Sequence, residues 1–248
     1  MIEFPQSKVN EIIASIDRHL DQFSGTPVAA FDADGTLWDM DLGENFFKYQ
    51  IRENLLPDLP ANPWEYYLNL HDNISAVQSY LWLAQINADL PIDQVREWAK
   101  KAVATVGELP IFKAHKQIID HLLKNNVDIF IVTASIQWAV EPGAQFLDIP
   151  TENVIGVKTR IENGLVTTEQ EGAVTYREGK VTGLLERNGN RHPFFCAGNT
   201  QGDLPLLEAS KGLRLVVAAS PETSTNYKSE RKMIELANER GWFCHSYL

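Results

Sequence analysis

The segment Val28-Ala-Ala-Phe-Asp-Ala-Asp-Gly-Thr-Leu37 is a short apolar run that ends in two aspartates, Asp32 and Asp34. Gly35 and Thr36 follow the second aspartate at once. An apolar run that leads into turn-forming residues predicts a buried strand with carboxylates at the edge of a sheet. Because ligands of open α/β sheets bind at that edge, the segment predicts a reaction site.

Strands and helices alternate on both sides of this segment. Helical spacing of apolar residues predicts a helix from Ser7 to Phe23. Later strands are predicted at 127–132, 154–157, 194–197 and 213–218, with helices at 115–125, 137–147, 180–187, 204–209 and 221–240. Residues 160–183 are predicted to form a hairpin, because Asn163-Gly164 is a turn signal. The alternation predicts an α/β fold with a Rossmann-like parallel sheet.

Residues 40–109 interrupt the alternation with helical patterns alone. The predicted helices are 44–56, 63–87 and 91–106, and the region is rich in aromatic residues. We therefore expect two parts: a core of residues 1–39 and 110–248, and an inserted helical domain of residues 40–109.

Composition narrows the classes of partner. The 248-residue chain has a net charge of −11, which argues against nucleic acid and anionic membranes but not against a small anionic substrate. We find no targeting segment and no apolar run of membrane-spanning length, and we expect a cytoplasmic protein. The two cysteines, Cys196 and Cys244, are expected to be free thiols.

Polar residues follow or flank several of the predicted strands, and parallel strands bring such residues to one edge of the sheet. They are Asp32, Asp34, Thr133, Ser135, Lys180, Asn199 and Asp203. One carboxylate can attack phosphorus while a second, two residues on, moves a proton. A hydroxyl and an ammonium can hold phosphoryl oxygens, and carboxylate and amide oxygens suit Mg²⁺.

Four sequence motifs resemble those of the haloacid dehalogenase-like hydrolase superfamily, in the order typical of that superfamily. They are Asp32-Ala-Asp-Gly-Thr36, the strand-terminal Thr133, Gly179-Lys-Val181 and Gly198-Asn-Thr-Gln-Gly-Asp203. The helical insertion after the first motif resembles the cap of the phosphoserine phosphatase-like branch. The resemblance covers residues 28 to 218 and implies a hydrolase core with a cap.

The resemblance also implies a role for each motif. Asp32 would be the nucleophile that forms an aspartyl-phosphate, and Asp34 the general acid and base. Thr133, Ala134 and Lys180 would bind the phosphoryl group. The residues that would hold or orient Mg²⁺ are Asp32, Asp34, Asn199 and Asp203.

Some assignments stay open at this stage. Asn199 stands where many members of the superfamily have Asp, so the metal site has one negative charge fewer. Lys158, at the end of a predicted strand, is a rival to Lys180 for the phosphate. A calcium loop is excluded, because it needs Gly and Glu at positions that this segment does not provide.

Three residues after the first motif are candidates for substrate specificity: Trp38, Asp41 and Glu44. The resemblance implies that acidic residues here contact a substrate amino group, and 41–47 also resembles phosphorylcholine phosphatases. Carboxylates beside aromatic rings can hold an ammonium group. We expect the remaining aromatics, Trp64, Tyr67, Trp82 and Trp98, to pack the inserted helices instead.

The sequence therefore predicts a Mg²⁺-dependent phosphatase for a small phosphomonoester such as phosphoserine or phosphocholine. A phosphotransferase or mutase of the same fold, and a non-catalytic binding protein, are the alternatives. A dehalogenase is disfavoured, because a departing halide needs no proton and Asp34 would then have no task. Oligomeric state is not predicted.

Overall fold

The computed structural model describes residues 2–22 and 25–248. Its main sheet has six strands in the order β3-β2-β1-β6-β7-β8, and all neighbouring pairs are parallel. The strands are β1 (Val28–Phe31), β2 (Asp128–Ile136), β3 (Val154–Val157), β6 (Phe195–Gly198), β7 (Leu213–Ala218) and β8 (Phe243–Ser246). The predicted Rossmann-like parallel sheet is confirmed.

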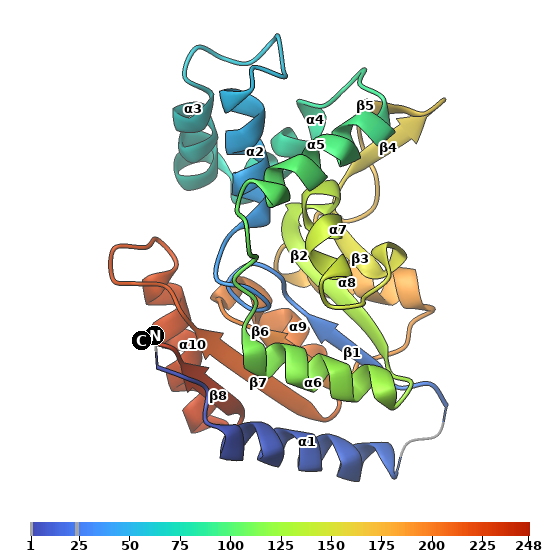
Figure 1. The fold of residues 1–248 in the computed structure, drawn as a ribbon, viewed down its shortest axis with the longest axis vertical. Helices are drawn as coiled ribbons and strands as arrows, with labels where there is room; N and C mark the ends of the chain where they lie inside the picture. The colour runs from blue at the N-terminus through green and yellow to red at the C-terminus, as the bar shows by residue number, and fades with distance from the viewer. Residues whose placement is uncertain (1, 23–24) are drawn as a thin grey trace.

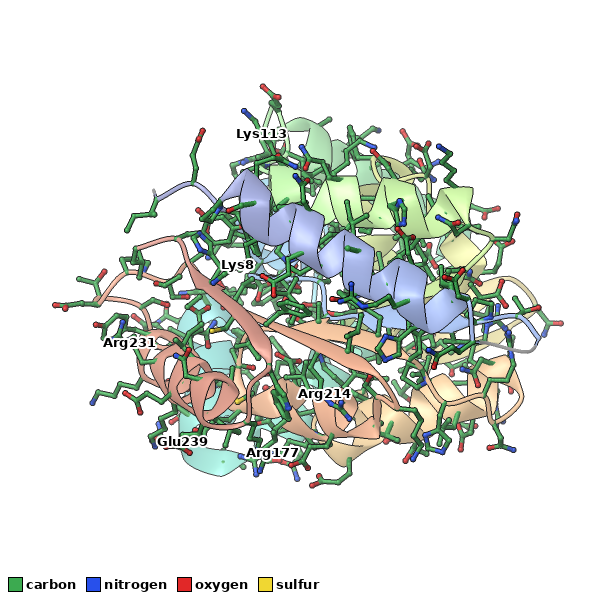
Figure 2. All side chains as sticks on the ribbon, turned by 90° about the horizontal axis from the view of Figure 1, so that it is seen from below. Lys8, Lys113, Arg177, Arg214, Arg231 and Glu239 are labelled. Carbon is green, nitrogen blue, oxygen red and sulfur yellow. The ribbon has the colours of Figure 1, made fainter. Side chains whose placement is uncertain are left out.

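Helices cover both faces of this sheet. One face carries α1 (Gln6–Leu20), α6 (Lys113–Lys124) and α7 (Gln137–Gln145), and the other carries α8 (Glu178–Asn188), α9 (Leu204–Ala209) and α10 (Tyr227–Glu239). Figure 2 shows α1 and α6 side by side across the first face. In β1, Ala29 and Phe31 pack on that face while Val28 and Ala30 pack on the other. A strand buried on both faces needs the continuous apolar sequence seen here.

Beyond one end of the sheet lies a separate group of helices, which we call the helical layer (Figure 1). It consists of α2 (Leu42–Arg52), α3 (Pro63–Asn69) with a π-helical turn at Leu70–Ile74, α4 (Ala76–Gln85) and α5 (Ile92–Ala104). The single helix predicted over 63–87 is wrong. It is divided at Ser75, which is extended and accepts a hydrogen bond from the Gln78 N–H as the N-cap of α4.

The helical layer packs around a second apolar cluster, which also includes Trp138 and Ala139 of α7. Buried Phe46, Phe47, Tyr67 and Val95 form part of it, and the three predicted packing tryptophans lie against them. These are Trp64, Trp82 and Trp98. The prediction that these aromatics pack the helices is confirmed.

A two-stranded hairpin, β4 (Thr159–Glu162) and β5 (Leu165–Gln170), packs against the helical layer. Asn163 and Gly164 have positive φ values of 50° and 81°, as a two-residue hairpin turn requires. Val166 exchanges backbone hydrogen bonds with Asp89 (2.8 Å) and Leu90 (2.9 Å). The predicted extension of the hairpin to residue 183 is wrong, because the chain turns into α8 at Glu178.

Two connections join the helical layer to the sheet, and they run side by side. The Asp39 N–H donates to the Pro110 carbonyl at 3.0 Å, and the Phe112 N–H donates to the Leu37 carbonyl at 3.0 Å. The chain therefore passes from the sheet to the helical layer and returns from it at neighbouring positions.

Several element ends differ from the prediction. β2 continues to Ile136, so Thr133 lies within the strand. α10 begins at Tyr227 instead of 221. The edge strand β8 was not predicted, because its four residues contain one strong strand former, Phe243, and end in polar His245 and Ser246. The predicted helix end at Phe23 lies outside the described residues. Across 2–22 and 25–248, no helix has the length and apolarity to cross a membrane.

Candidate active site

The carboxyl ends of β1, β2 and β6 and the start of α8 surround one cavity of about 90 Å³. Adjacent β1 and β6 bring the first and last motifs together, since Phe31 pairs with Ala197. Residues from all four motifs line the cavity: Asp32, Asp34, Thr133, Ala134, Lys180, Asn199 and Asp203. The structure therefore gathers the predicted site residues at the sheet edge where α/β proteins bind ligands.

Lys180 bridges two carboxylates at the floor of the cavity. Its Nζ lies 2.5 Å from Oδ1 of Asp32 and 2.6 Å from Oδ1 of Asp203, and all three side chains are buried. Thr36 donates its hydroxyl to the other Asp32 oxygen at 2.9 Å. Burial and the charge of Asp203 outweigh Lys180 and raise the pKa of Asp32 to about 7.

Asp34 is held by three hydrogen-bond donors. Its Oδ1 accepts from the Trp38 indole at 2.8 Å and from the Leu42 N–H at 2.9 Å. Its Oδ2 accepts from the Ser135 hydroxyl at 2.7 Å. Burial raises the pKa of Asp34, and these hydrogen bonds partly offset that rise. Asp34 is thus fixed in orientation and biased toward its protonated form.

Trp38 lies beneath the site and does not line the cavity. Its side chain is 0% exposed, so its ring has no free face for a substrate ammonium. The prediction of a substrate contact for Trp38 is corrected: the indole N–H positions Asp34.

The two candidate lysines, Lys158 and Lys180, lie in different cavities. Lys158 pairs with Glu171 at 2.8 Å and lines a different cavity, of about 280 Å³, between β3 and α8. Thr133 lies beside Lys180 in the first cavity, where its hydroxyl accepts the Ser135 N–H at 3.1 Å. The structure therefore groups Lys180, and not Lys158, with the carboxylates.

The loop after β6 is folded around Asp203. Oδ2 of Asp203 accepts the backbone N–H groups of Asn199 (3.1 Å) and Thr200 (2.9 Å). Asn199 donates its side-chain Nδ2 to Glu230 of α10 at 2.9 Å. Among the hydrogen bonds of the described residues, none reaches Oδ1 of Asn199. Both oxygens of Asp203 thus accept hydrogen bonds, whereas within residues 2–22 and 25–248 the amide oxygen of Asn199 accepts none.

The donors of this cavity suit a magnesium ion. In residues 2–22 and 25–248, no three His, Cys, Asp or Glu side chains converge closely enough to hold an ion unaided. The cavity nevertheless offers hard oxygen donors, namely the carboxylates of Asp32 and Asp34 and the amide oxygen of Asn199. Mg²⁺ takes such oxygens and keeps several waters, so it does not need three acidic side chains. The residues present fit this ion.

The opposite wall of the cavity comes from the helical layer and the segment before α8. Asp41, the N-cap of α2, lies there with Tyr80 and Tyr176, whose ring centroids are 5.6 Å apart. Glu44 lines a neighbouring cavity of about 290 Å³ that also contains Asp41. Sequence reasoning missed both tyrosines, since neither follows a strand nor belongs to a motif.

Comparisons with known proteins agree with this architecture. The family model described as haloacid dehalogenase-like hydrolase matches residues 29–208. A Bordetella pertussis Tohama I protein of unknown function is 20% identical, with 89% of this chain and 98% of that chain covered and a TM-score of 0.69. A phosphoserine phosphohydrolase-like protein from Francisella tularensis subsp. tularensis SCHU S4 is 19% identical, with 89% and 95% covered and a TM-score of 0.56.

A substrate-bound phosphoserine phosphatase has the same fold, at 15% identity, 86% and 99% coverage and a TM-score of 0.51. None of the curated proteins compared with the sequence matches it. In fold, the structure resembles this phosphoserine phosphatase, as the helical insertion implied. The chain belongs to the haloacid dehalogenase-like hydrolase family.

Proposed function

We propose that this protein is a phosphatase that hydrolyses small phosphomonoesters by way of an aspartyl-phosphate on Asp32. The arrangement around Asp32 carries the proposal. Its carboxylate is held between Lys180 (2.5 Å) and Thr36 (2.9 Å) and lines a cavity that Asp34 also lines. A buried nucleophile beside a separately fixed acid is what a two-step phosphoryl transfer requires.

The first step transfers the phosphoryl group to the protein. An oxygen of Asp32 forms a bond to phosphorus while the bond from phosphorus to the leaving oxygen breaks. Asp34 gives its proton to that leaving oxygen, and burial raises the pKa of Asp34, which favours the protonated form that this step needs. Lys180 and Thr133 hold the non-bridging oxygens.

The second step restores the enzyme. Asp34, now ionised, takes a proton from water as the water oxygen attacks phosphorus, and the bond to Asp32 breaks. Mg²⁺, when bound, would draw negative charge from the phosphoryl oxygens. We propose that Asp32, the Asp34 carbonyl and the Asn199 amide oxygen hold it, and that Asp203 orients Lys180 and the loop.

We further propose that residues 40–109 act as a cap and that the substrate carries an ammonium group. Asp41 places a carboxylate on the cavity wall, and the adjacent rings of Tyr80 and Tyr176 can contact a cation through their faces. Glu44 adds negative charge at the neighbouring cavity, although Lys48 pairs with it at 3.0 Å. Phosphoserine, phosphoethanolamine and phosphocholine have this chemistry.

Hydrolysis of p-nitrophenyl phosphate, with and without Mg²⁺, tests the reaction. We expect Mg²⁺-dependent release of phosphate that Asp32→Asn abolishes. Activity that survives Asp32→Asn would refute the nucleophile. Transfer of the phosphoryl group to an added alcohol, in place of water, would favour a phosphotransferase.

A substrate panel tests the ammonium proposal. We expect the kcat/KM for the three ammonium-bearing esters to exceed that for glycerol phosphate and sugar phosphates. Asp41→Asn should lower the ammonium-to-neutral ratio of kcat/KM about tenfold, the effect of ~1.4 kcal/mol. Asp58→Asn, an exposed aspartate of the same region, is the control. A preference for neutral esters would overturn the proposal.

A further inference from the structure

Glu230 of α10 is a buried carboxylate at the back of the candidate site. Its side chain belongs to a residue that is 1% exposed, on the face of α10 that also buries Met233 and Ala237. An acidic residue on the apolar face of a helix is costly to bury unless donors satisfy it. Glu230 therefore needs a specific set of partners.

Four donors surround that carboxylate. Oε1 accepts from Nδ2 of Asn199 at 2.9 Å and from the Ser220 hydroxyl at 2.8 Å. Oε2 accepts the N–H groups of Ala219 at 3.0 Å and Ser220 at 2.8 Å. An acceptor-only group at this place forces the amide nitrogen of Asn199 toward α10. The amide oxygen must then occupy the other side of the planar group.

Close packing keeps Asn199 in this orientation. A Cβ on Gly35 would lie 2.2 Å from Nδ2 of Asn199, and Gly35 has a φ of +77°. The first motif thus approaches the Asn199 amide so closely that only glycine fits. Asn199 also lines the cavity that contains Asp32. Its side chain therefore connects that cavity to the Glu230 carboxylate through the hydrogen bond from Nδ2.

We propose that Glu230 is a positioning residue that fixes Asn199 as an oxygen ligand for the metal and supplies the negative charge that a neutral amide lacks. This inference rests on the proposed function only in assuming that the site binds Mg²⁺. The proposal implies that a carboxylate can stand at position 199 or at position 230, but not at both. An aspartate at 199 would face Glu230 across about 3 Å, and two like charges at that distance disfavour each other.

A double-mutant cycle tests the proposal through metal affinity. The Kd for Mg²⁺ is measured by calorimetry, and that for Mn²⁺ by electron paramagnetic resonance, on wild type, Glu230→Gln, Asn199→Asp and the double variant. We expect each single change to weaken binding by about 10- to 100-fold, as loss of an orienting partner does. The double variant exchanges the two groups, so that a carboxylate at position 199 accepts from an amide at position 230. Its affinity should return to within about threefold of wild type.

Glu235→Gln, an exposed glutamate of the same helix, is the control and should leave both Kd values unchanged. Unchanged affinity in Glu230→Gln, or losses that add in the double variant, would overturn the proposal. Wild type that binds no divalent ion would also overturn it. If Glu230→Gln does not fold, the comparison of Asn199→Asp with the double variant still decides. Phosphatase activity is assayed separately, so coupled metal binding without hydrolysis would refute the proposed function alone.

Discussion

The buried indole of Trp38 donates a hydrogen bond to Oδ1 of Asp34 at 2.8 Å. The two residues are four apart in sequence, and the turn between them lets the indole reach back beneath the sheet edge. A residue in contact with neither the cavity nor the solvent thereby sets the orientation of the acid that faces the cavity.

Trp38→Phe is expected to lower kcat about tenfold, the equivalent of one lost hydrogen bond of ~1.4 kcal/mol. KM should change little, because the ring does not line the cavity. The indole is among the donors that lower the pKa of Asp34, so its loss raises that pKa. The limb of the kcat profile that requires ionised Asp34 should move to higher pH. Trp98→Phe, in the helical layer, is the control.

Asp32→Asn is expected to stabilise the metal-free protein at pH 8 by ~2 kcal/mol. The pKa of Asp32 rises from 3.8 to about 7 on folding. Its contribution to stability is therefore fully present below pH 3.8 and is lost as the pH rises through 7. Asparagine has no such loss, so the advantage of the variant should shrink toward pH 4. Urea unfolding in the presence of EDTA measures the difference in the free energy of unfolding between Asp32→Asn and wild type. A variant less stable than wild type at pH 8 would contradict the prediction.

Lys180→Met is expected to destabilise the protein by about 3–5 kcal/mol at pH 8, because it leaves two buried carboxylates without a counter-charge. The loss should be smaller at pH 5, because Asp32, whose pKa is raised to about 7, can take up a proton there. Lys158→Met removes a partly exposed partner of Glu171 and should cost less than about 1 kcal/mol. Thermal unfolding at both pH values measures the stability that each variant loses relative to wild type. Equal losses in Lys180→Met and Lys158→Met would contradict the prediction.

The motif residues could be predicted from sequence because each signal is local. Asp32 and Asp34 directly follow an apolar run, and Asn199 lies in a turn sequence after another. The parallel arrangement of the strands then brings these ends to one edge without further information. Lys180 had a weaker signal, because a lysine after glycine is by itself an ordinary turn residue, and its role in phosphate binding came from the resemblance.

Residues that reach the site through tertiary packing could not be predicted. Tyr80 of α4 and Tyr176, in the loop before α8, are nearly a hundred positions apart, and no periodicity links them. Glu230 left a weak signal, an acid in helical register with Met233 and Ala237, which its polar neighbours obscured. Trp38 was predicted at the substrate from closeness in sequence, but burial places it behind Asp34.

A last prediction concerns acid stability. His115 of α6 is 0% exposed, and both its ring nitrogens lack a hydrogen-bond partner among the described residues. The aromatic rings of Phe4 and Phe112 lie beside it, with centroids at 6.3 and 5.7 Å. Burial, with a smaller effect of His245, lowers the pKa of His115 from 6.5 to about 3.

Between pH 6.5 and about 3, His115 therefore binds a proton in the unfolded chain but not in the folded protein. Stability from this group is present above pH 6.5 and is lost as the pH falls toward 3, by about 2 kcal/mol between pH 8 and pH 5. His115→Phe should unfold with less dependence on pH over that interval, as urea midpoints at pH 8, 6.5 and 5 would measure. His192→Gln, at an exposed histidine, is the control. A His115→Phe variant with the same slope as wild type would show that His115 takes up its proton in the folded state.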